Sequence, residues 1–89
     1  MSNATLIQNV RGLCEAYRCG KLPLRELARQ VKLHADSFEA LRFEQRKQMQ
    51  SLAYDLEIQA HYAAEECEYQ ADVERILSEL SDWLRKAPV

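Results

Sequence analysis

The sequence predicts an all-α fold, an antiparallel four-helix bundle formed by a single domain over residues 1–89. Apolar residues recur at steps of three and four along most of the chain, which is typical of helices that bury one face. The chain contains only two Gly and two Pro, so it has few of the residues that tight turns between strands require. No segment shows the alternation of apolar and polar residues that a half-buried strand would need.

The first helix is predicted over residues 4–19, and the signals at its two ends are strong. Ser2 or Asn3 can cap its start, because both side chains accept hydrogen bonds from first-turn N–H groups. Gly20 lies where a helix commonly ends in a residue of left-handed conformation. A short connection should therefore follow.

The second and third helices are predicted over residues 23–34 and from 37 to about 58, or on to 66. Pro23 suits the first turn of the second helix, where its missing N–H is not needed. The segment Asp36-Ser37-Phe38-Glu39 resembles a capping box, which marks a new helix start. Gln45 interrupts the apolar stripe of the third helix.

The fourth helix is predicted over residues 72–86, with Asp72 or a residue just before it as its cap. Residues 59–71 are either helix or loop: their Ala and Glu favour helix, yet a bundle needs a reversal in this region. Arg85 and Lys86 suit the negative end of the last helix dipole.

The charges divide the chain into a basic and an acidic part. Residues 1–54 contain five acids and nine bases, whereas Asp55 to Asp82 contains nine acids and only Arg75 as a base. The acidic stretch therefore carries −8, although the whole chain carries only −2. Such a field steers the encounter with charged partners, but it can also be a solvated face that keeps the protein soluble.

Catalytic and metal-binding patterns are missing from the sequence. It has no glycine-rich phosphate loop and no nucleophile elbow. His34 is expected to pack at the edge of the core, and His61 with Glu65 would supply only two of the ligands that a metal needs. We therefore expect no enzyme, no cofactor and no metal.

The cysteines and the chain's start bear on the compartment. Cys14, Cys19 and Cys67 have neither zinc-site nor redox-pair spacing, so we expect reduced thiols, with an intermolecular disulfide as the alternative. Residues 1–9 lack a basic region followed by an apolar stretch, and no apolar run is long enough to span a membrane. These observations predict a cytoplasmic location.

One functional alternative is a small DNA-binding regulator that uses residues 23–47. Their apolar spacing resembles a helix-turn-helix motif, and Arg42, Arg46 and Lys47 could contact phosphates. Lys32 replaces the usual turn glycine, and an ordinary helix hairpin would give the same spacing.

The preferred alternative is a protein-binding module without nucleic acid. Proteins that bind nucleic acid have basic clefts, and an inhibitor can fill such a cleft with carboxylates where phosphates would lie. The density of acids after Asp55 favours this interpretation, which leaves the oligomeric state open.

Three features of the chain resemble the small helical immunity proteins of the colicin D type, including those paired with contact-dependent growth inhibition toxins. They are the segment Gly20–Ala28 (GKLPLRELA), a long central helix followed by the acidic stretch 55–72, and the closing helix from Val73 to Leu80. The resemblance implies a cytoplasmic bundle that blocks a cognate, transfer-RNA-cleaving nuclease toxin. It also implies an acidic contact surface: Asp55, Glu57, Glu65, Glu66, Glu68 and Asp72.

Two tyrosines within this stretch, Tyr62 and Tyr69, are candidate anchors, because buried aromatic side chains often dominate binding energy at interfaces. The alternative for both is that they pack beneath the acidic segment.

Overall fold

The computed structural model describes residues 2–65 and 73–87, without the side chains of residues 63–65. Four helices follow one another in this part of the chain: α1 (Asn3–Arg18), α2 (Leu24–Ala35), α3 (Phe43–Glu65) and α4 (Val73–Lys86). The described residues contain no strand. The predicted all-α four-helix bundle is therefore confirmed.

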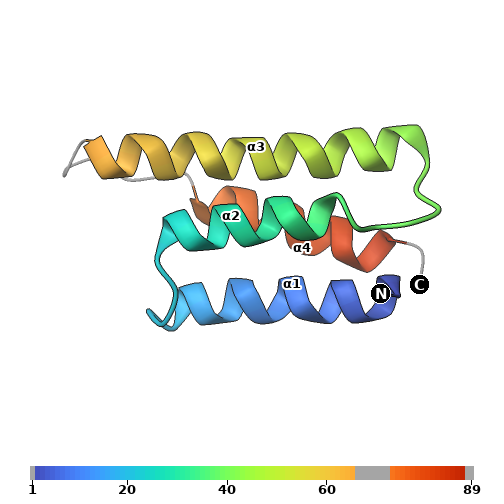
Figure 1. Ribbon diagram of the computed structural model, residues 1–89, viewed down its shortest axis with the longest axis horizontal. Coiled ribbons are helices and arrows are strands. Elements are labelled where there is room, and N and C mark those ends of the chain that lie inside the picture. The colour runs from blue at the N-terminus through green and yellow to red at the C-terminus, as the bar shows by residue number, and fades with distance from the viewer. Residues whose placement is uncertain (1, 66–72, 88–89) are drawn as a thin grey trace.

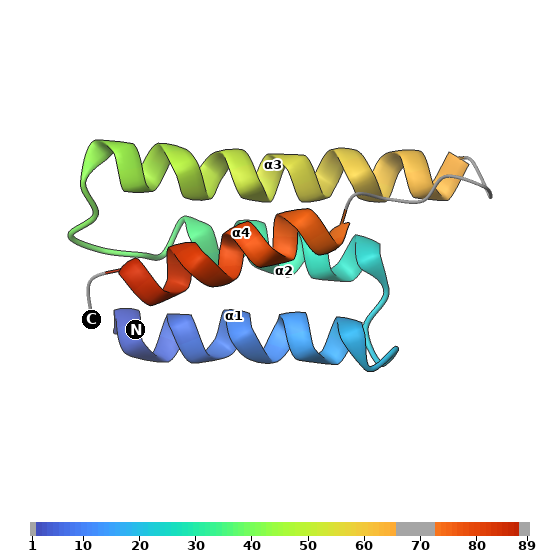
Figure 2. The ribbon, with the colours of Figure 1, turned by 180° about the vertical axis from the view of Figure 1, so that it is seen from behind.

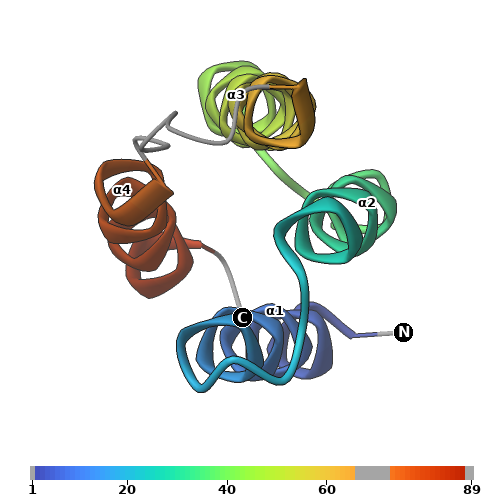
Figure 3. The same ribbon diagram turned by 90° about the vertical axis from the view of Figure 1, so that its left-hand side faces the viewer.

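The helices form one ring of neighbours around a shared core. Seen end-on, they follow the order α1, α2, α3, α4 around the bundle (Figure 3). Each helix runs antiparallel to the next, and the start of α1, the end of α4 and the connection from α2 to α3 lie at the same end (Figure 1). The view from behind shows α4 between the levels of α1 and α3 (Figure 2).

The core is built from apolar side chains of all four helices. No polar or charged side chain of the described residues is buried. This is the arrangement that helices with one apolar stripe produce when they pack together. Its largest fully buried members are Leu6, Leu27, Met49, Leu56, Ile76, Leu77, Leu80, Val10 and Val31.

Local signals fix both ends of α1 as the sequence predicts. The Ser2 hydroxyl oxygen accepts a hydrogen bond from the Thr5 N–H at 3.2 Å. At the other end Gly20 has φ +76°, and the Lys21 N–H donates to the Ala16 carbonyl at 2.9 Å. This bond belongs to the Schellman motif, in which a left-handed residue ends the helix.

The start predicted for the third helix at residue 37 is wrong, because α3 begins at Phe43. The residues of the expected capping box make other contacts. The Ser37 hydroxyl donates to the Leu33 carbonyl at 3.3 Å and so helps to end α2. The backbone of Glu39 is bound by the Asn3 side chain, which accepts from its N–H at 3.0 Å and donates to its carbonyl at 2.7 Å.

Gln45 accounts for both the true start of α3 and the interruption of the apolar stripe. Its side-chain oxygen accepts from the Arg42 N–H at 3.2 Å, which satisfies a donor at the helix start. Its side-chain amide donates to the Lys86 carbonyl at 3.4 Å, and its own carbonyl accepts from Trp83 Nε1 at 2.9 Å. Gln45 thus joins the start of α3 to the end of α4.

The other predicted bounds differ only slightly from the structure. α2 begins at Leu24 with Pro23 at its N-cap. α4 is described from Val73 onward, and the predicted start and cap at Asp72 lie outside the described residues. α3 continues to Glu65, in agreement with the longer of the two predicted ends. Among the described residues, no helix is both long and apolar enough to cross a membrane.

Candidate protein-binding surface

The structure describes only part of the acidic surface that the sequence predicts. Asp55, Glu57 and Tyr62 lie on α3, and Glu65 is its last residue. Four further members of the predicted surface, Glu66, Glu68, Tyr69 and Asp72, lie outside the described residues, as does the side chain of Glu65. The surface as a whole therefore remains a prediction.

Among the described residues of the acidic stretch, four carboxylates form ion pairs with bases of the chain itself. Glu57 pairs with Lys32 at 3.2 Å, and Glu74 pairs with Arg18 at 3.5 Å. These two pairs join the acidic part of the sequence to its basic part, across α2–α3 and α1–α4. Within α4, Glu79 pairs with Arg75 and Asp82 pairs with Arg85.

These ion pairs are all at the surface. Their side chains keep between 38% and 73% of their surface exposed. An exposed pair of this kind contributes about 0–1 kcal/mol to stability, so a binding partner can replace it at little cost. Counting charges along the sequence missed these partners, because two of the pairs are formed only when distant helices pack together.

Asp55 and Tyr62 lie on the acidic half of α3 and differ in exposure. Asp55 is half-buried and forms no ion pair with the residues that the structure describes. Tyr62 keeps 46% of its surface exposed, and its ring meets that of His61 edge-on with centroids 5.9 Å apart. Tyr62 is therefore the more exposed of the two side chains.

Two shallow hollows flank the Lys32–Glu57 pair along the seam between α2 and α3. They have volumes of about 280 and 350 Å³. Four buried alanines, Ala28, Ala35, Ala53 and Ala60, form the seam between the two helices. Small side chains let the helices approach closely and leave room at the surface.

The start of α2 carries a local charge cluster that sequence reasoning did not identify. The Glu26 carboxylate accepts hydrogen bonds from Arg29 and from Gln30 Nε2, the second at 3.0 Å. The Arg29 bond, followed by that of Gln30, lowers the pKa of Glu26 to about 2. Glu26 therefore stays ionised and balances part of the basic charge of this helix.

His34 and His61, which the sequence analysis considered and set aside as catalytic or metal-binding residues, lie on α2 and α3, and the side chain of Glu65 lies outside the described residues. His34 is half-buried on α2, and its Nδ1 lies 2.7 Å from the Gln30 carbonyl. Within residues 2–65 and 73–87, no three His, Cys, Asp or Glu side chains are placed to hold a metal ion.

The two cysteines that the structure describes differ in environment. Cys14 is buried, which raises the pKa of its thiol, whereas Cys19 is exposed. The third, Cys67, lies outside the described residues. Burial makes Cys14 a poor nucleophile, as expected for a thiol that serves packing.

The segment considered for DNA binding has the geometry of a helix hairpin. Residues 36–42 separate α2 from α3, and the two helices lie antiparallel, whereas a helix-turn-helix has a turn of three or four residues and crossed helices (Figure 1). Arg42 and Lys47 are exposed, but Arg46 is half-buried and donates to the Phe38 carbonyl at 3.4 Å.

Comparison with family models, curated proteins and solved structures finds no match to this chain.

Proposed function

We propose that this chain is an immunity-type protein that neutralises a cognate bacterial nuclease toxin of the transfer-RNA-cleaving kind. Its acidic surface would cover the basic active-site cleft of the toxin. The observation that carries the proposal is the net charge of −8 between Asp55 and Asp82 in a chain of only −2 overall. Carboxylates at this density can occupy the positions that the phosphates of the substrate would take.

The described part of the acidic stretch is compatible with this role. Its ion-paired carboxylates keep at least 38% of their side-chain surface exposed, and the lysine and arginines that hold them are exposed as well. A toxin can replace such an exposed pair at little cost, because the pair contributes only about 0–1 kcal/mol. Once a carboxylate is desolvated against an arginine of the toxin, truncating one member of the contact costs about 2–5 kcal/mol. Tyr62, half exposed on the same helix, supplies an aromatic anchor.

The test is a triple charge reversal, Glu65→Lys with Glu66→Lys and Glu68→Lys. The partner to assay is the protein encoded next to this chain's gene, tested for transfer-RNA cleavage and for its inhibition by this chain. We expect inhibition to weaken at least about 100-fold, since even one lost contact of this kind can cost that much. Circular dichroism should show unchanged helicity.

The matched control reverses three acids outside the acidic stretch, Glu15→Lys, Glu39→Lys and Glu44→Lys, and so changes the net charge equally. This variant should inhibit like the original chain. Inhibition that survives the first triple reversal, or falls equally in both variants, would reject the proposed surface.

A gel shift with random duplex DNA at low salt separates this proposal from the DNA-binding alternative. We expect no shift. A shift that disappears when Arg42, Arg46 and Lys47 are replaced by Ala, and that weakens steeply with salt, would favour the regulator instead.

A further inference from the structure

One of the two hollows of the α2–α3 seam, the one that includes the end of α2, has acidic, aromatic and apolar walls. It has a volume of about 280 Å³. Two buried alanines form its apolar floor. Around this floor, beside Lys32, lie two carboxylates, an amide and a phenol ring, those of Asp36, Glu57, Gln50 and Tyr54.

The Asp36 carboxylate in this hollow lacks the partner that the sequence predicts for it. In the expected capping box it accepts from the Glu39 N–H, but the Asn3 side chain takes that hydrogen bond. Among the described residues, the Asp36 side chain forms neither a hydrogen bond nor an ion pair. Asp36 is also the C-cap of α2, at the negative end of the helix dipole, where a carboxylate is unfavourable. The position therefore favours a cation from outside the chain.

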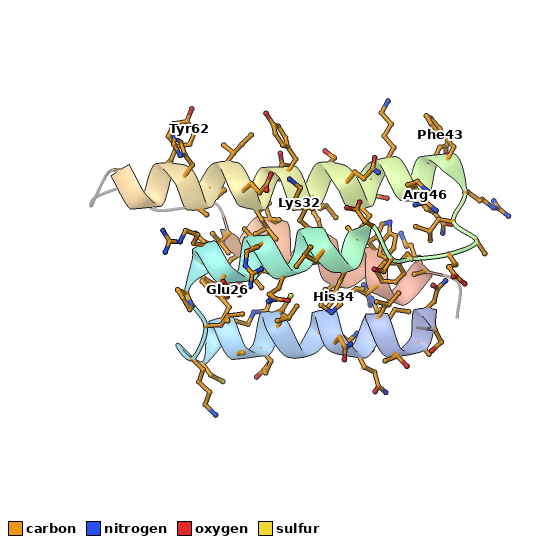
Figure 4. All side chains as sticks on the ribbon, viewed as in Figure 1. Glu26, Lys32, His34, Phe43, Arg46 and Tyr62 are labelled. Carbon is orange, nitrogen blue, oxygen red and sulfur yellow. The ribbon has the colours of Figure 1, made fainter. Side chains whose placement is uncertain are left out.

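The chain's own cation occupies only one part of the hollow. Lys32 projects from α2 towards α3, and its Nζ lies 3.2 Å from the Glu57 carboxylate (Figure 4). Lys32 and Asp36 are one turn apart, about 6 Å along the helix, yet the ammonium pairs with Glu57 and not with Asp36. Two carboxylates and one ammonium leave the lining with a net charge of −1.

Two further bases, Arg46 and Lys47, precede the hollow on α3 and do not line it. Arg46 donates to the Phe38 carbonyl at 3.4 Å. Lys47 is exposed and forms no ion pair within the described ranges. Neither of them therefore pairs with Asp36.

The second hollow of the seam has the opposite character. Its lining includes Arg25, Arg29 and His61, and Arg25 lies in the first turn of α2, at the positive end of the dipole. The seam is thus acidic where α2 ends and basic where α2 begins. A cationic side chain that lies along it is attracted to the first hollow and repelled by the second.

Tyr54 gives the acidic hollow an aromatic wall. Three large aromatic side chains are exposed on α3, those of Phe43, Tyr54 and Tyr62, and Tyr54 keeps 62% of its surface exposed. Phe43 and Tyr62 project away from the bundle at opposite ends of the helix, and only Tyr54 lines one of the two hollows (Figure 4). An aromatic ring beside carboxylates suits a guanidinium better than an ammonium, because the planar guanidinium stacks on rings.

We propose that this hollow receives an arginine side chain of a basic protein partner. The guanidinium lies between Asp36 and Glu57 with its plane against Tyr54, and its methylenes cover the two alanines. Its five donors form a planar fork that reaches both carboxylates, which a single ammonium does not. Lys32 gives up Glu57 to the guanidinium at little cost, because the pair is exposed.

This site deepens the proposed function and rests on it for the identity of the partner. Glu57 belongs both to the hollow and to the predicted acidic surface. The hollow thus assigns one arginine of the toxin's basic cleft to the α2–α3 seam, at the border of that surface.

The first experiment titrates the full chain with N-acetylarginine methylamide and follows its backbone amide signals by NMR. We expect a dissociation constant of about 1–10 mM, with shifts centred on Asp36, Gln50 and Tyr54. The matched probe is the citrulline analogue, which has nearly the same shape without the charge and should bind at least about five-fold more weakly. Equal binding of both probes, or shifts as large at Arg25 and Ala28, would overturn the proposal.

The second experiment repeats the titration with Asp36→Asn, which keeps the shape and removes the charge. Binding should weaken about five-fold, the effect of one partly exposed charge contact. The temperature of thermal unfolding should not fall, because the substitution removes a carboxylate from the negative end of α2. Glu44→Gln, at an exposed position of α3 outside the hollow, is the control and should bind like the original chain. Equal losses in both variants, or a lower unfolding temperature for Asp36→Asn, would contradict the site.

The same variant separates the site from the proposed function. The arginine probe is titrated without any nuclease, so a hollow that binds no arginine leaves the inhibition of a toxin to be decided by the triple charge reversal. In the inhibition assay, Asp36→Asn should weaken inhibition about five-fold and Glu44→Gln should not. Full inhibition by Asp36→Asn, despite its weaker arginine binding, would place the hollow outside the toxin interface and so reject the assigned partner.

Discussion

The connection from α1 to α2 and the connection from α2 to α3 reverse the chain in different ways. In the first, residues 19–23 are held by backbone bonds of α1 itself: the Gly20 N–H donates to the Tyr17 carbonyl at 3.0 Å, beside the bond that Lys21 makes. In the second, residues 36–42 are held by side chains from other helices, above all Asn3 from α1 and Trp83 from α4.

The comparison shows that a loop can be stabilised locally or by the tertiary structure. A glycine with positive φ can end a helix before the rest of the bundle exists. Phe38, by contrast, keeps only 2% of its surface exposed because it packs edge-on against Trp83, with ring centroids 5.0 Å apart. The second connection therefore takes its conformation only when α4 is in place.

The largest effect should come from Phe38→Ala, which removes the anchor of the second connection. Loss of a buried aromatic side chain costs about 3–5 kcal/mol, measured as the free energy of unfolding in urea. In a domain this small, that loss can approach the whole free energy of unfolding, and the variant can fail to fold. Phe38→Leu is therefore the companion variant, which is expected to cost about 1–2 kcal/mol. A change below about 1 kcal/mol for Phe38→Ala would mean that the loop does not depend on this contact.

Asn3→Ala should have an intermediate effect, because it removes both hydrogen bonds to the Glu39 backbone. At about 1 kcal/mol for each bond, the loss should be about 2 kcal/mol. Faster amide exchange at Glu39 would locate the effect in the second connection. Asn3→Asp is the control, since it keeps the acceptor for the Glu39 N–H and should recover about half of the loss.

The smallest effect should come from Gly20→Ala, in the first connection. A side chain at φ +76° costs about 1 kcal/mol, and no atom lies within 4 Å of the added Cβ, so the cost is conformational. The matched control is Gly12→Ala within α1, which also meets no atom within 4 Å and should stabilise the helix by about 0.5–1 kcal/mol. Thermal unfolding should give opposite signs; equal signs would contradict the role of Gly20.

The elements that could be predicted from the sequence are those with a local cause. The stripes of α1, α2 and α4, the Ser2 cap and the Gly20 end all follow from residues within one or two turns of each other. The start of α3 could not be predicted, because the local pattern Asp36–Glu39 favours a cap there. The contact of Asn3 with the Glu39 backbone and the bonds of Gln45 favour another start, six residues later.

The candidate surfaces show the same division. The density of acids after Asp55 is visible in the sequence, but the partners Lys32 and Arg18 are not, since they come from helices far away in the chain. Phe43 and Tyr54 were also missed. A helical projection of the sequence would have shown that both residues lie away from the buried stripe of α3 and are therefore exposed.

The sequence alone determines that this chain forms four amphipathic helices, because burial of an apolar stripe and the chemistry of helix ends act over short distances. Only the tertiary structure decides where α3 begins, which charges pair and which aromatic side chains remain outside. These outcomes depend on groups that are distant in the chain and meet only after the helices have packed.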